Sequence, residues 1–93
     1  MMYPYMSLTD ETEIVHSHLI EEIGVQKVLV HFERPTDIGF DSARCELPSY
    51  NWVLIDGYSK AEIDLFERLL RKHFYLLYKC ASSCSQESES KGD

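Results

Sequence analysis

The chain has 93 residues, of which 44% are hydrophobic and 12% aromatic, and its net charge is −7. This length supports a single domain with a modest core, and the composition is that of a globular protein. No apolar run reaches the roughly 18 residues of a membrane span, and the N-terminus lacks the positive and apolar regions of a secretory signal.

The first third of the chain is expected to hold a helix over residues 9–23, after an irregular lead-in over residues 1–7. Ser7 or Thr9 can serve as the N-cap, and acidic residues follow near the positive end of the helix dipole. An apolar stripe at helical spacing supports this prediction: Val15, Leu19 and Ile23. Gly24 is a natural residue to end the helix.

The middle of the chain shows the period of two that is typical of strands. Residues 26–33 and 40–47 both alternate apolar and polar side chains, and turn-forming residues separate them over 34–39. We expect these two strands to form a hairpin with a loop of about six residues. Residues 52–55 form a short apolar run that is either a third strand or an extended linker.

A helix over residues 59–81 is the clearest prediction. Ser59 and Glu62 form a capping box, and Tyr58 and Ile63 form a hydrophobic staple around it. One apolar row is expected to pack on the sheet: Ile63, Phe66, Leu70, Phe74 and Leu77. A second row lies beside it, namely Leu65, Leu69 and Leu76, and the two rows together form a face that is broader than one small sheet requires.

Charge divides the chain. Residues 1–26 contain five acidic side chains and no Lys or Arg, whereas the final helix is mildly basic. Within that helix, Asp64–Arg68 and Glu67–Arg71 have the i,i+4 spacing of ion pairs on a solvent face. The acidic segment therefore either complements the basic helix or faces a basic partner.

These elements predict an α+β fold. A small antiparallel sheet of two or three strands would carry the N-terminal helix and the long C-terminal helix on one face, in the order α-β-β-β-α. The domain would span residues 1–81, and the Ser- and Glu-rich residues 82–93 would form a disordered acidic tail.

This order of elements resembles that of the double-stranded-RNA-binding domain. In that family a basic cluster at the start of the last helix grips phosphates. The matching stretch here is Ser59-Lys60-Ala61-Glu62, which has a single Lys followed by an acid. The resemblance covers topology alone, and we expect no nucleic-acid binding.

The cysteines and histidines do not form a recognisable metal site. Cys45, Cys80 and Cys84 are an odd number, which favours reduced thiols in a cytoplasmic protein over a disulfide scaffold. The spacings of common zinc sites are absent from these cysteines and from the four histidines, His16, His18, His31 and His73. We therefore expect no metal and no cofactor.

Motifs for catalysis are equally sparse. A pairing of Cys45 with His31 on neighbouring strands is conceivable, but a core thiol beside a surface imidazole is the more common arrangement. Arg34, Asp37 and His31 near the hairpin loop could line a pocket of a small enzyme or ligand-binding protein. This pocket is the alternative to the main hypothesis.

The main hypothesis is a non-enzymatic interaction or regulatory module that forms a homodimer or binds a protein partner. Tyr and Trp are common anchors at protein interfaces. Leu side chains that the core does not bury form an exposed apolar surface, which is typical of an interaction site. The candidate interface residues are Tyr50, Trp52, Tyr58, Leu65, Leu69 and Leu76. An acidic protein that mimics nucleic acid or neutralises a basic toxin is a special case of this hypothesis.

Overall fold

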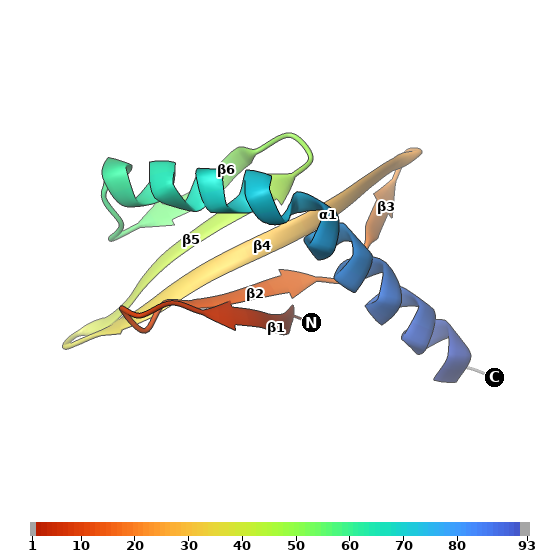
Figure 1. Cartoon of the computed structure of the whole chain (residues 1–93), viewed down its shortest axis with the longest axis horizontal. Coiled ribbons are helices and arrows are strands. Elements are labelled where there is room, and N and C mark those ends of the chain that lie inside the picture. The colour runs from red at the N-terminus through yellow and green to blue at the C-terminus, as the bar shows by residue number, and fades with distance from the viewer. Residues whose placement is uncertain (1, 92–93) are drawn as a thin grey trace.

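The structure is a computed structural model that describes the backbone of residues 2–91 and the side chains of residues 2–84. Within these residues, six antiparallel strands precede one long helix (Figure 1). The strands are β1 (Met2–Ser7), β2 (Glu13–Ser17), β3 (Ile20–Glu22), β4 (Val25–Thr36), β5 (Gly39–Leu47) and β6 (Asn51–Asp56), and the helix is α1 (Lys60–Lys91).

The long strand β4 organises the sheet, whose order is β1-β2-β4-β5-β6. One side of β4 pairs with β5 along most of its length. The other side pairs with β3 at its beginning and with β2 further along. Strands β1 and β6 are therefore the two edges of the sheet.

The predicted N-terminal helix is wrong, and so is the small sheet that was expected with it. Residues 9–23 instead hold β2, β3 and the turns around them, and the expected lead-in forms β1. Ile14 and His16 are buried beneath α1, at 1% and 2% exposure. Their spacing of two residues is that of one face of a strand. Ile23, expected on the helix stripe, is fully exposed in the two-residue turn between β3 and β4.

The predicted hairpin and final helix are present with changed limits. Strands β4 and β5 pair from Val28–Leu47 to Thr36–Gly39, so their loop has two residues rather than about six. The run over 52–55 is a true strand, because β6 pairs with β5. The helix α1 extends past residue 81; the side chains of most of the expected tail, 85–93, lie outside the described residues.

The core lies between α1 and one face of the sheet. The rings of Phe32 on β4 and Phe66 on α1 stack with centroids 4.3 Å apart and planes 8° apart. Both belong to the buried cluster: Ile14, Val28, Val30, Phe32, Ala43, Cys45, Leu47, Tyr58, Ile63, Phe66, Leu70, Leu77 and Ala81. The row of α1 expected to face the sheet does so, with Phe74 at the margin of the cluster.

Among the described residues, no helix covers the opposite face of the sheet (Figure 1). This face carries the alternate side chains of β4 and β5, including Leu29, His31, Arg44 and Glu46, which are partly exposed. In the described part of the chain, no helix combines the length and apolar character needed to cross a membrane.

Candidate interaction surfaces

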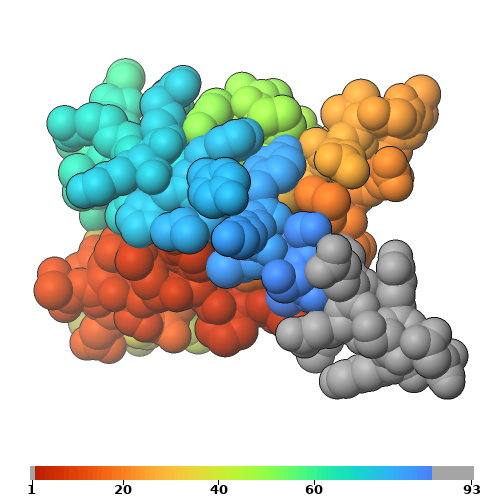
Figure 2. Space-filling model, turned by 45° about the vertical axis from the view of Figure 1, so that its right-hand side comes forward, coloured from red at the N-terminus to blue at the C-terminus, as the bar shows by residue number. Residues whose placement is uncertain are grey.

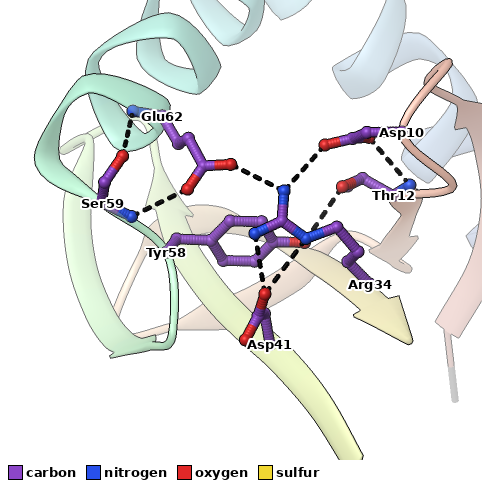
Figure 3. A network of polar contacts seen from close by, with 7 residues as sticks. All are labelled: Asp10, Thr12, Arg34, Asp41, Tyr58, Ser59 and Glu62. Atoms are coloured by element: carbon purple, nitrogen blue, oxygen red, sulfur yellow. Dashed lines mark hydrogen bonds and ion pairs between the residues drawn. The ribbon is translucent and has the colours of Figure 1, made fainter. Parts of the chain in front are cut away.

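Arg34 on β4 ties four segments of the chain together (Figure 3). Its Nε and Nη2 atoms donate to Oδ2 of Asp41 on β5 at 3.0 and 2.7 Å. Its Nη1 atom donates to Asp10 in the β1–β2 loop at 2.9 Å and to Glu62 on α1 at 2.6 Å. The guanidinium also lies 4.6 Å from the ring centroid of Tyr58.

The start of α1 belongs to the same network. The amide of Ser59 donates to Glu62 at 2.9 Å, and the amide of Glu62 donates to the Ser59 hydroxyl at 3.2 Å. This is the predicted capping box. The Glu62 carboxylate therefore caps the helix and pairs with Arg34 at once.

Charge pairing shifts the pKa values in this network. Hydrogen bonds from Arg34 and from the Ser59 amide lower the pKa of Glu62. Burial alone would raise the pKa of Asp10, but bonds from Thr12 and Arg34 together lower it. The hydrogen bonds that Arg34 donates to Glu62 and Asp41 raise the pKa of Arg34. Every side-chain nitrogen of Arg34 donates to a carboxylate, so the network fixes the fold and presents no free cation to a substrate.

The alternative pocket does not assemble from its three predicted residues. Arg34 lies on the α1 side of the sheet, whereas His31 lies on the opposite side. There Nε2 of His31 is 3.2 Å from Oε1 of Glu33, and Nδ1 of His31 is 3.4 Å from Nε of Arg44. Asp37 is exposed in the two-residue turn of the β4–β5 hairpin. The geometry provides no common site for these side chains.

The conceivable Cys45–His31 pair is separated in the same way. Cys45 pairs with Val30 on the α1 face and is fully buried, whereas His31 pairs with Arg44 on the other face. The described residues contain no group of three or more His, Cys, Asp or Glu side chains that could hold a metal ion.

The three aromatic candidates for the interface differ in exposure. Tyr58 is buried at 6%, and its hydroxyl lies 3.1 Å from that of Thr12, so it belongs to the core. Trp52 is half-buried, with its ring 5.7 Å from that of Phe32. Tyr50 is half-buried beneath the guanidinium of Arg71, 4.1 Å from its ring centroid.

The three leucine candidates lie along one flank of α1. Leu65 is 53% exposed and Leu76 is 50% exposed, whereas Leu69 packs against the margin of the core. A groove of about 680 Å³ runs beside this flank, bounded on its other side by the residues that follow β1. The predicted second row is therefore a surface that the fold leaves open.

Edge strand β6 forms another apolar surface, which was not predicted from the sequence. Val53, Leu54 and Ile55 are exposed at 51%, 40% and 50%, and they follow one another without a charged residue. A bulge in the pairing with β5 accommodates Val53 between Trp52 and Leu54. The apolar run was visible in the sequence, but its position at an edge depends on the strand order.

The two edges of the sheet differ in their protection against pairing with another chain. Pro4 interrupts β1, and its register with β2 shifts between Pro4 and Met6. Proline and bulges are devices by which proteins protect edge strands. Strand β6 also has a bulge, but it contains no Pro and no Lys, so it is the less protected edge.

Comparisons with known proteins identify no relative. No family model, no curated protein and no solved structure matches the chain.

Proposed function

We propose that the protein is a non-enzymatic interaction module that self-associates through β6. The observation that carries this proposal is the run of three exposed apolar side chains, Val53 to Ile55, on an edge strand. An edge presents unpaired backbone donors and acceptors, and an apolar edge without charges favours pairing with another strand.

A second copy is the partner that fits this edge best. Antiparallel pairing about an axis between Val53 and Leu54 places Trp52 opposite Ile55 of the other copy. Trp52 and Ile55 pair with Cys45 and Ala43 on β5, so both belong to the α1 face of the sheet. The self-pairing thus matches apolar residues on the same face, as cross-strand pairs require.

The polar residues at the two ends of β6 are compatible with this register. Asp56 falls opposite Asn51 of the other copy, so an amide rather than a second carboxylate meets the acid. Asn51 and Asp56 pair with Glu46 and Ser42, which share the face opposite α1. Like charges directly opposite each other, which destabilise a strand pair, are therefore avoided.

Sedimentation equilibrium tests the proposal. The wild-type chain is expected to be a dimer at concentrations of about 10–100 µM, and Leu54→Lys is expected to be a monomer because it places a charge in the new sheet. Leu65→Lys is the matched control: Leu65 is similarly exposed but lies on α1, so this variant is expected to stay dimeric. Circular dichroism checks that both variants fold.

A monomeric wild-type chain at these concentrations contradicts self-association. A dimer that survives Leu54→Lys but dissociates with Leu65→Lys contradicts the assignment to β6 and moves the interface to α1.

A reducing, cytoplasmic location remains part of the proposal, on the basis of the three cysteines. Fractionation of the native host tests it.

A further inference from the structure

A second surface of α1 combines apolar and basic side chains in two parallel rows. The apolar row is Leu65, Leu69 and Leu76, and the basic row is Arg68, Lys72 and Lys79. Each basic residue follows an apolar one by three positions, so the rows lie side by side on the helix. We call this surface the basic flank.

The basic flank borders the N-terminal strand along a continuous line. Figure 2 shows the helix, in cyan to blue, directly above the red N-terminal segment. The hydroxyl of Tyr5 lies 2.7 Å from Nδ1 of His73, which holds β1 against α1 at this border. Two hollows follow the line: the groove of about 680 Å³ beside Leu65 and Leu69, and one of about 440 Å³ beside Leu76 and Lys79.

The cations of the basic flank have no carboxylate partner among the described side chains. The ion pairs among the described side chains include none with Arg68, Lys72 or Lys79. Their basic members are Lys27, His31, Arg34, Lys60 and Arg71. The predicted Asp64–Arg68 pair is not formed, because Asp64 pairs with Lys60 at 3.2 Å. Among the described side chains, these three cations lie beside the leucines without an acidic partner, although the chain as a whole has a net charge of −7.

We infer that the basic flank binds an amphipathic, acidic helix of a partner protein. The leucines would receive the apolar face of that helix, and the three cations would pair with its Asp and Glu side chains. The hollows follow α1 from Glu62 to Cys84, about 33 Å at 1.5 Å per residue, which is the length of a docked helix rather than of a small ligand.

A helical partner fits better than an added strand. Strand addition would use the backbone of β1, where Pro4 removes a donor and the shift after Pro4 breaks the register. A helix needs no backbone pairing, and its side-chain ridges can pack into the grooves beside the i,i+4 rows of α1.

A broad anionic surface such as a membrane or nucleic acid fits less well. The carboxylates of Asp10 and Glu62 line the same groove as Leu65 and Arg68. They would face any extended negative surface, and the whole chain would be repelled by it. A helix with charges at defined positions can avoid these two carboxylates.

Fluorescence anisotropy with two synthetic peptides tests the inference. Both probes have about 18 residues and the same leucine pattern along one helical face, and they differ only in carrying Glu or Lys at the flanking positions. The Glu peptide is expected to bind about tenfold more tightly than the Lys peptide. Binding is expected to weaken as ionic strength rises.

Matched double variants locate the site. Arg68→Glu with Lys72→Glu is expected to weaken the Glu peptide by about tenfold, because it reverses two cations of the basic flank. Lys60→Glu with Arg71→Glu makes the same change in net charge, but both residues already pair with acids on α1, so an effect below about twofold is expected. Leu65→Ala with Leu76→Ala is expected to weaken both peptides, because it removes apolar contact area.

Three results would overturn the inference: equal binding of both peptides to the wild type, equal loss in the two charge-reversal variants, or tight binding to phosphatidylglycerol vesicles without binding of the Glu peptide. Sedimentation of Arg68→Glu with Lys72→Glu keeps this test separate from that of β6. That variant is expected to remain a dimer, because neither residue lies on the β6 edge.

Discussion

Gly57 lies directly against the carboxylate of Asp41: a Cβ at Gly57 would stand 2.1 Å from Oδ1 of Asp41. Gly57 also has a φ of 98°, a left-handed conformation that favours glycine. Because Arg34 holds Asp41 in place, the carboxylate cannot move aside freely. We predict that Gly57→Ala lowers the free energy of unfolding by about 2–3 kcal/mol, measured by urea denaturation.

Gly24→Ala is the control for this prediction. Gly24 has a φ of 75°, but a Cβ there would meet nothing within 4 Å. Only the backbone cost of about 1 kcal/mol should remain. Asp41→Ala should reduce the effect of Gly57→Ala in a double-mutant cycle, and a full cost in that background would show that the carboxylate is not the obstacle.

The Arg34 network predicts how stability depends on pH. The folded-state pKa values of Asp10 and Glu62 are lowered, so their stabilisation is present above the unfolded-state pKa values and is lost as pH falls through the folded-state values. We predict that Arg34→Met costs about 2 kcal/mol at pH 7, a modest value because Asp10 and Glu62 are partly exposed. The gap between wild type and variant should shrink from about pH 5 to pH 3.

Lys60→Met provides the comparison, because it breaks the Lys60–Asp64 pair, in which both side chains are largely exposed. This variant should stay close to wild type across the same pH range. A constant gap between wild type and Arg34→Met down to pH 3 would contradict the role of ionised Asp10 and Glu62.

Local signals made the C-terminal half of the fold predictable. The capping box of Ser59 and Glu62 fixed the start of α1, and the alternation over residues 26–33 and 40–47 fixed the central hairpin. The N-terminal half was not predictable in this way. Buried His16 interrupts the apolar period of β2, while Val15, Leu19 and Ile23 imitate a helical stripe.

The candidate surfaces also differ in whether local sequence signals could predict them. Leu65, Leu69 and Leu76 could be selected from the sequence because they share a helix with a known core face. The exposure of β6 could not, because it follows from the strand order. The Arg34 network joins Asp10, Asp41 and Glu62 from distant parts of the chain. Only the tertiary structure therefore reveals that every side-chain nitrogen of Arg34 donates to a carboxylate.

The turn between β3 and β4 holds a β-branched residue in an unfavourable conformation. Ile23 has a φ of 48° and is fully exposed, so no packing compensates for the backbone cost. Asn tolerates this region and suits a two-residue hairpin turn before Gly24. We predict that Ile23→Asn raises the free energy of unfolding by about 1 kcal/mol, measured by thermal and urea denaturation.

Ile38→Asn separates the backbone effect from the loss of an exposed apolar group. Ile38 is equally exposed in the β4–β5 turn, but its φ is not positive. This control should therefore show no gain in stability. An equal gain in both variants would show that removal of an exposed isoleucine, rather than relief of strain at residue 23, is responsible.

Cys45 is predicted to be chemically inert in the folded protein. Burial, aided by Glu67 and Glu46, raises its pKa to about 12, so almost no thiolate forms at neutral pH. Cys80 and Cys84 are only half-buried on α1. In the Cys80→Ser, Cys84→Ser double variant, a thiol reagent such as Ellman's reagent should react only after denaturation, because the remaining thiol lies beneath α1. Rapid reaction of that variant under native conditions would show that α1 opens from the sheet, which would contradict the closed core on which both proposed surfaces are built.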